Sequence, residues 1–475
     1  MTTLPLTEPA SVQAESAAGL GEFRASAAFP LPRLRPVADF VALPTPKRYV
    51  TVQAKFGIAL GATALWLLLA VLGAMAVLPR MDDVVPWPIG AVLFLVVVAL
   101  PGIVVTFSLA GLVLDQPPAP TVARPAVPAT VAITARNQAR SVVATLAALR
   151  TQDYSGPLTV LLVDNGSTDA TVDEARRAAA QLGIDLKVLV ERRVGVVHAR
   201  NAAAAVTDTP LLVVLDAGTV LHPSAVRLLV ARLLRSPSDT AAVSAHALVR
   251  NTRAGDLPET IAYDYSLNAH ANQRVHGLFQ APLVAEGACS LYRTDAVRAV
   301  EGWSRDDVDG VMITWRFLER GWRVFHEPLA VAFTSQPVTL GSWAARRVRA
   351  ANSIVEGARV KGLRSLRFPF NRFVAMLDAT APVLDGIFTG GALLALALVV
   401  MGAPGLALAY ALLVLPVSVA FAIAIRRAMR RALDDVGLTV PGGPRAWAGT
   451  GLSLHVVQAP LGAWNALAQL FGRVD

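Results

Sequence analysis

The sequence has little cysteine, little charge and few aromatic residues. Among its 475 residues there is one cysteine, Cys289, and only 16% are charged and 6% aromatic. A single cysteine excludes a disulfide framework and suits a reducing compartment. There is no RNA-binding motif and no basic patch interleaved with aromatic residues, so we expect no nucleic-acid partner. The net charge of +9 suits an anionic membrane face or a phosphate-bearing substrate.

Hydrophobic residues, in contrast, make up 54% of the chain, which is typical of a membrane protein. Two long apolar runs cover 56–78 and 88–114, and the first is uncharged over about 23 residues, enough to cross a bilayer. Lys47, Arg48 and Lys55 precede the first run. The positive-inside bias therefore predicts two transmembrane helices within 56–114, with the chain entering from and returning to the cytoplasm.

The C-terminal part is apolar again and predicts further membrane contacts. Two more spans are expected within 383–425, followed by a basic cytoplasmic loop over 426–446 that begins with four arginines within six residues, 426–431. Residues 447–471 hold several polar side chains, which fits either a fifth span or an interfacial helix. Residues 356–382 mix basic and apolar residues, so we expect an amphipathic segment on the membrane surface.

The segment between these apolar regions alternates short valine- and leucine-rich runs with amphipathic stretches. The runs at 130–135, 158–163, 186–191, 211–215 and 240–247 read as strands, and the stretches between them as helices. Continuous apolar strands alternating with helices predict a mostly parallel sheet covered on both faces, the Rossmann-like α/β class. We expect this domain to cover 130–355, preceded by a disordered tail at 1–46 and a proline-rich linker at 115–129.

Polar residues follow three of the predicted strands. Asn137 follows the first strand, "DNGSTDAT" with Asp164 and Gly166 the second, and Asp216 the fourth. Ligands of open α/β sheets bind outside the carboxyl ends of the strands. Asp164 could accept hydrogen bonds from a base or ribose, and Gly166 would allow close backbone approach. Taken alone, "DNGSTD" is equally typical of an ordinary capped turn; the ordered series of loops favours a nucleoside site.

Several segments of the chain resemble those of a known family. The segments "VAITARNQ", "LTVLLVDNGSTDAT", "HARNAAAA" and "LLVVLDAGTVLHPSAV" are similar to the nucleotide-binding half of glycosyltransferase family 2. "EGACSLYRTDAVRAVEGW" and "ITWRFLERGWRVFHEPLAVAF" resemble its acceptor half, and the order of the segments matches over roughly 130–351. The flanking apolar runs make the chain most like membrane synthases of the poly-N-acetylglucosamine, chitin-oligosaccharide and cellulose type.

The resemblance implies a GT-A fold, a nucleotide-diphospho-sugar donor such as a UDP-sugar, Mg²⁺ or Mn²⁺, and inversion at the anomeric carbon. It implies that Asp164 contacts the nucleoside and that Asp216 is the first carboxylate of the DxD pair, which would contact ribose or the metal. Asp309 is the candidate catalytic base if the motif is shifted by one residue; an ungapped alignment places Gly310 there instead. The QxxRW motif reads "RRVRA", so Arg346 and Arg349 would hold the diphosphate.

Four motif positions lack the usual residue of the family: Gln138, Gly218, Gly310 and Ala350. Two of these changes remove carboxylates from the expected metal and base positions. The sequence therefore supports two functions. The first is an inverting glycosyltransferase in a bacterial inner membrane, with a cytoplasmic GT-A domain, four to five transmembrane helices and a polysaccharide or lipid-linked acceptor. The second is a pseudo-glycosyltransferase that partners an active synthase. A lipid-phosphate mannosyl- or glucosyltransferase fits the fold but matches the acceptor half less well.

Overall fold

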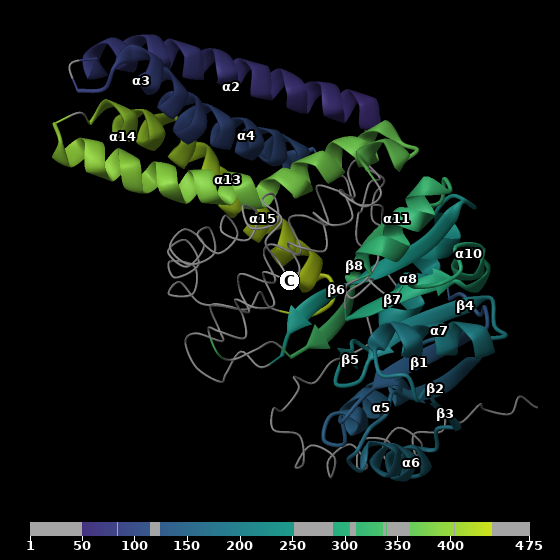
Figure 1. Cartoon of the computed structure of the whole chain (residues 1–475). Helices are drawn as coiled ribbons and strands as arrows, with labels where there is room; N and C mark the ends of the chain where they lie inside the picture. Colours follow the sequence, from purple (N-terminus) through teal and green to yellow (C-terminus); the bar gives the residue numbers. More distant parts are fainter. Residues whose placement is uncertain are drawn as a thin grey trace, which may run out of the picture.

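The chain folds into a helical bundle joined to an α/β domain (Figure 1). The computed structural model describes residues 50–82, 84–114, 124–250, 288–304, 310–335, 339, 362–402 and 404–438. The predicted tail at 1–46, most of the linker at 115–129 and the candidate fifth span at 447–471 lie outside these residues.

One half of the central sheet is parallel and carries the predicted nucleotide-binding loops. It consists of β1 (Ala129–Ala135), β2 (Leu158–Asp164), β3 (Leu186–Val190) and β4 (Leu211–Asp216), in the order β3-β2-β1-β4. Within β1, Ala135 pairs with Asp164 of β2, and Thr134 pairs with Asp216 of β4. This register brings the carboxyl ends of three strands to one edge, with the two aspartates on either side of β1.

The other half of the sheet is mixed. β7 (Cys289–Arg293) runs antiparallel between β4 and β6 (Thr240–Val249), β8 (Arg323–Thr334) is parallel to β6, and β5 (Val220–Leu221) is antiparallel to β8. The predicted fifth strand is therefore β6, but it does not continue the parallel series beside β4. β7 occupies that place, because this later segment enters the sheet from the opposite direction.

Helices cover both faces of the sheet, as the apolar strands predict. One face packs against α5 (Val142–Arg150), α6 (Thr171–Leu182) and α8 (Ala225–Arg235). The other packs against α7 (Val196–Val206), α10 (Thr294–Ala299) and α11 (Val311–Glu319). Every residue of β1 and of β6 is buried. The sheet is thus the middle layer of a three-layer domain.

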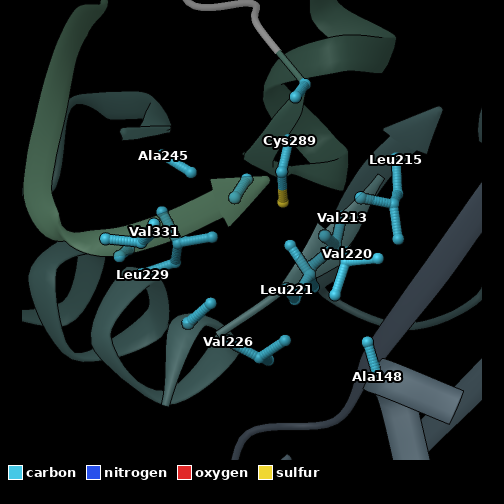
Figure 2. Packing of buried hydrophobic residues seen from close by; sticks show 14 of the residues in the cluster. Ala148, Val213, Leu215, Val220, Leu221, Val226, Leu229, Ala245, Cys289 and Val331 are labelled. Atoms are coloured by element: carbon cyan, nitrogen blue, oxygen red, sulfur yellow. The ribbon is translucent and has the colours of Figure 1, made fainter. Parts of the chain in front are cut away.

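Cys289 belongs to the core of this domain. Its thiol points into the packing formed by Val213, Val220 and Leu221 (Figure 2). Burial, reinforced by the charge of Asp216, raises the pKa of the thiol to about 12. A thiol that stays protonated is a poor nucleophile, so Cys289 is a packing residue.

Three helices among the described residues are long and apolar enough to cross a membrane: Val52–Met81, Trp87–Val113 and Gly405–Asp434. The first is α2; the second joins α3 (Trp87–Phe94), a π-helical turn and α4 (Leu100–Val113). The third joins α14 (Gly405–Ala409), another π-helical turn and α15 (Leu415–Asp434). Many of their large apolar side chains face outward, including Leu65, Leu68, Leu72, Val92 and Leu412. Exposed apolar surface on this scale is typical of surfaces that contact lipid or another protein.

A fourth long helix, α13 (Pro369–Val400), lies against this bundle (Figure 1). It is continuous, so the boundary predicted between an interfacial segment ending at 382 and a span beginning at 383 falls inside one helix. The helix runs through Pro382 at this boundary, although proline usually ends or kinks a helix. Leu398 of α13 is buried with Trp66 and Phe94 of the first two spans.

The bundle contacts the α/β domain through α11. Val311, Trp315 and Leu318 of this helix are buried together with Ala59 of α2 and Phe107 of α4. Aromatic rings of α2, α4 and α13 complete the contact, with centroids of Phe56 and Phe107 5.8 Å apart and those of Phe107 and Phe373 5.2 Å apart. The "ITWRFLE" stretch of the predicted acceptor half is therefore attached directly to the candidate membrane helices.

The end of α15 forms a second contact between the two parts. Met429, Leu433 and Val436 are buried in the same cluster as the sheet residues. Arg430 and Arg431 lie on the same turns of the helix. The arginine-rich end of the third candidate span therefore sits beside the α/β domain.

His222 lies in the core close to this contact, between β5 and α8, and is fully buried. Its backbone N–H donates to the carbonyl oxygen of Val331 (3.0 Å), and its Nδ1 accepts from the N–H of Ser224 (3.3 Å). Burial lowers the pKa of His222 to about 4, against smaller opposite effects of the Val436 backbone and Asp153.

We expect His222 to make the protein less stable as the pH falls from about 6.5 towards 4. The folded chain keeps the imidazole neutral, whereas the unfolded chain binds a proton below the ordinary pKa. Its contribution is therefore complete above the unfolded pKa and decreases by up to about 3 kcal/mol on acidification. Thermal unfolding of wild type and His222→Asn across this pH range checks the expectation, because asparagine retains an acceptor but does not titrate. Equal pH dependence of the two proteins would contradict it.

Candidate functional site

The loops after β1 and β2 are hydrogen-bonded to each other at the carboxyl edge of the sheet. Asn137, in the left-handed region with φ of 54°, donates its backbone N–H to the Ser167 hydroxyl (3.1 Å). Its side-chain oxygen accepts from the N–H of Thr168 (2.8 Å). The backbone N–H of Gln138 donates to the hydroxyl of Thr171 (2.7 Å). Asn137 therefore ties the two predicted nucleotide-binding loops into one surface.

Asp169 strengthens the same connection. Its carboxylate accepts from the backbone N–H groups of Ala139 (3.2 Å) and Thr171 (3.1 Å). A side-chain hydrogen bond from Thr171, together with these backbone donors, holds the pKa of Asp169 below its ordinary value. A carboxylate at the start of α6 also complements the helix dipole.

Asp164 and Asn165 occupy the end of β2 and are both buried. Asp164 accepts from the backbone N–H of Ser167 (3.2 Å). The amide of Asn165 donates to the carbonyl of Arg193 (2.7 Å) and accepts from the N–H of Gly195 (2.7 Å). Asn165 thus fixes the loop between β3 and α7 against the Asp164 loop, next to Gly166, whose φ is 72°.

Asp216 is held by a buried arginine. Its Oδ1 accepts from Nη2 of Arg200 in α7 (3.4 Å) and from the hydroxyl of Thr134 in β1 (3.1 Å). The Arg200 side chain is 4% exposed, whereas that of Asp216 is 49% exposed. An internal cation therefore supports a carboxylate that faces the edge of the sheet.

Neutral groups surround Gly218, the position of the second DxD carboxylate. Its N–H donates to the hydroxyl of Thr145 in α5 (2.9 Å). Gly218 has φ of 94°, and a Cβ added there would lie 3.2 Å from Cβ of Ser141. The Ser141 hydroxyl in turn hydrogen-bonds the side-chain oxygen of Gln138. The two departures at Gln138 and Gly218 are thus neighbours in space, and the side chains around them are uncharged.

Three predicted site residues, Asp309, Arg346 and Arg349, lie outside the described residues, as does Ala350. Gly310 is described and starts α11 with φ of 73°. Its carbonyl oxygen accepts from the N–H (3.3 Å) and the hydroxyl (2.7 Å) of Thr314. An L-residue with a side chain is strained at this φ, so the backbone itself favours glycine at 310.

The sequence analysis missed Arg200 and Asn165. Both are buried polar residues. Arg200 lies within the alanine-rich helix "VVHARNAAAAV", and Asn165 follows Asp164, which was predicted to contact the nucleoside. A lone arginine among small apolar helix residues was the available signal, because buried charges are normally paired.

The residues present do not fit a divalent-cation site in which Asp216 and position 218 are the ligands. Such ions prefer several oxygen ligands, usually carboxylates. Asp216 is already bound to a guanidinium, and Gly218 offers no carboxylate. No group of three histidine, cysteine, aspartate or glutamate side chains able to hold a metal occurs within the part of the chain that the structure describes.

A three-layer α/β domain with polar loops at the carboxyl ends of its parallel strands is typical of proteins that bind ligands, nucleotides among them, at that end of the sheet. Comparison with protein families makes this specific. Residues 130–300 match the family model "Glycosyl transferase family 2". The chain therefore contains a glycosyltransferase family 2 domain with a GT-A fold, attached to helices long enough to span a membrane.

Two curated relatives are similar to part of the chain. An N-acetylglucosaminyltransferase of Rhizobium leguminosarum bv. viciae is 27% identical over 222 residues, 44% of this chain and 51% of the relative. The poly-beta-1,6-N-acetyl-D-glucosamine synthase of Staphylococcus aureus (strain COL) is 23% identical over 229 residues, 47% of this chain and 54% of the relative. The chain thus spans about half the length of these relatives.

Two solved structures are similar at lower identity. A mannosyltransferase from Pyrobaculum calidifontis, in complex with GDP-Man and Mn²⁺, aligns with a TM-score of 0.48 and 19% identity over 79% of this chain and 99% of its own. S. aureus TarS 1-349, in complex with UDP-GlcNAc, aligns with a TM-score of 0.38 and 13% identity over 72% of this chain and 92% of its own.

We expect Gly218→Asp to destabilise the protein by about 1–3 kcal/mol rather than restore a DxD site. The positive φ strains any side chain, and the new Cβ meets Ser141. Thermal unfolding of Gly218→Asp is compared with that of Gly183→Asp. Gly183 also has a positive φ, 63°, but has open space where a Cβ would stand. Adding Ser141→Gly to each variant should recover part of the lost stability in Gly218→Asp and none of it in Gly183→Asp. A Gly218→Asp protein as stable as wild type would contradict this expectation.

Proposed function

We propose that this chain is a membrane-bound inverting glycosyltransferase. It transfers a sugar from a UDP-sugar to a polysaccharide or lipid-linked acceptor. The observation that carries the proposal is the register of β1 with β2 and β4, which brings the polar loops of a family 2 domain to one edge. The names of the two curated relatives support N-acetylglucosamine as the transferred sugar.

The proposed donor site uses the loops around β1. Asp164 and the Asn137 loop hold the nucleoside, and Gly166 allows the backbone close to it. Asp216, half-exposed beside Arg200, accepts from a hydroxyl of the donor. Arg346 and Arg349 carry the charges that bind the diphosphate, since arginine suits bidentate contact with phosphate oxygens.

The proposed chemistry is a single displacement. The acceptor hydroxyl oxygen attacks the anomeric carbon, Asp309 takes the hydroxyl proton, and the bond from that carbon to the diphosphate oxygen breaks, so that UDP leaves. Two observations support Asp309 over position 310: the backbone favours glycine at 310, and Asp309 directly precedes the start of α11 in the sequence. A helix N-terminus stabilises a carboxylate in its ionised form, which is the form a base needs.

The contact between α11 and the candidate spans supports an acceptor at the membrane. Trp315 and Leu318 join this helix to α2 and α4, so the proposed base is next in sequence to an element fixed to the bundle. The arginines at the end of α15 lie on the side of the α/β domain. By the positive-inside rule this side is cytoplasmic, which supports a bacterial inner membrane with a cytoplasmic catalytic domain and lipid contacts along the spans.

A second candidate function is a pseudo-glycosyltransferase that binds nucleotide and partners an active synthase. The uncharged surroundings of Gln138 and Gly218 favour it, because carboxylates are missing where the family resemblance expects them.

The two functions separate in one experiment. The full chain is purified in detergent, and UDP release is measured with a panel of UDP-sugars, with and without Mn²⁺, alongside UDP binding. Turnover with any donor supports the enzyme. UDP binding without turnover, in the presence of membrane lipids and candidate acceptors, supports the pseudoenzyme. Absence of both binding and turnover contradicts both functions.

A further inference from the structure

The contacts of Asp216 limit which ligands this carboxylate can bind. Both of its described side-chain contacts, from Arg200 at 3.4 Å and Thr134 at 3.1 Å, fall on Oδ1. A Mn²⁺ or Mg²⁺ ion bonded to this carboxylate would approach to about 2.1 Å of an oxygen. It would then stand a few ångströms from a guanidinium that is buried and poorly screened, and the two like charges would repel each other.

The surroundings of Gly218 also disfavour a divalent cation at this place. The space that a side chain at 218 would enter is bounded by Ser141, and the backbone N–H of Gly218 is bound by Thr145. The side-chain oxygen of Gln138, which accepts from the Ser141 hydroxyl, lies 3.7 Å from the place of a Cβ at 218. Neutral donors and acceptors therefore surround the place where a second acidic ligand would be required.

We infer that this chain binds its nucleotide-sugar donor without a divalent cation, and that Asp216 contacts a donor hydroxyl directly. The inference rests on the proposed function. Arg200 acts as a positioning residue: it orients Asp216, so that the exposed part of the carboxylate can accept a hydrogen bond from a ribose hydroxyl. Bonds of this kind to a charged acceptor contribute about 1.5–3 kcal/mol.

The test measures binding of UDP and of uridine to the full chain in detergent by isothermal titration calorimetry, once with EDTA and once with Mn²⁺. We expect UDP to bind in EDTA with an affinity within about threefold of that in Mn²⁺. UDP binding that requires Mn²⁺, or that Mn²⁺ tightens by about tenfold or more, overturns the inference and leaves the proposed function standing. No nucleotide binding under either condition overturns both.

Asp216→Asn tests the role of the carboxylate. If it accepts a hydroxyl, the variant weakens UDP and uridine by about the same factor, on the order of tenfold, with and without Mn²⁺. If it ligates a metal, the loss appears for UDP in Mn²⁺ and is absent in EDTA, which contradicts the inference. The matched control is Asp208→Asn, an exposed aspartate just before the opposite end of β4, which should leave every affinity unchanged.

Discussion

Asp309→Ala is expected to reduce UDP release by about 10²- to 10⁴-fold, because a general base contributes rate enhancement of that size. The acceptor hydroxyl is a poor nucleophile until its proton is removed, and the alanine side chain cannot accept it. UDP affinity should remain within about twofold of wild type, since the base contacts the acceptor and not the nucleotide. Steady-state UDP release and calorimetric UDP binding, measured on the same preparation, separate the two quantities.

The control for this change is Asp306→Ala, which removes another carboxylate from the same segment. It should leave turnover close to that of wild type. Equal loss of turnover in both variants would indicate a general effect on the segment. Loss of turnover in Asp306→Ala alone would indicate that Asp306, and not Asp309, is the base.

Arg227→Met is expected to lower the free energy of unfolding by about 3–5 kcal/mol, the typical cost of removing one partner of a buried ion pair. The Arg227 side chain is 2% exposed, and its Nε donates to Oδ2 of Asp153 at 3.0 Å. Ser224 donates to the same oxygen (2.8 Å). Methionine fills a similar volume, so the loss reports mainly on the charge left at Asp153. Thermal or chemical unfolding of the purified protein measures it.

Arg177→Met provides the comparison, because Arg177 pairs with Glu174 at 2.6 Å on the exposed face of α6. Exposed pairs contribute about 0–1 kcal/mol, so this variant should unfold close to wild type. A similar small effect for Arg227→Met would show that Asp153 finds other partners and that the pair adds little to stability.

The parallel half of the sheet was predictable because its strands are short apolar runs separated by amphipathic helices. β1, β2 and β4 lie within one residue of their predicted bounds, and Gly183 ends α6 in the left-handed region, as glycine at a helix end usually does. The position of β6 was not predictable in this way. Strand neighbours and direction depend on pairing across many residues, and β7 enters between β4 and β6 from a distant segment.

For the candidate site, the sequence predicted that Asn137, Asp164, Gly166 and Asp216 lie at the carboxyl ends of neighbouring strands, and the fold places them there. Their role in binding a nucleotide sugar stays a prediction. Arg200 was not predicted, since it approaches Asp216 from a helix 16 residues away along the chain. In the sequence Gln138 and Gly218 are separate departures from the family pattern, whereas in the fold both lie next to Ser141.

Composition and periodicity by themselves determined that this protein combines long apolar helices with an α/β domain, because burial leaves a regular spacing of apolar residues in the sequence. The resemblance to glycosyltransferase family 2 came from the motif segments. Only the tertiary structure decided what Asp216 touches and why glycine stands at 218. The first depends on the buried guanidinium of Arg200 in α7 and the second on Ser141 before α5. These residues come close to Asp216 and Gly218, respectively, only in the folded sheet.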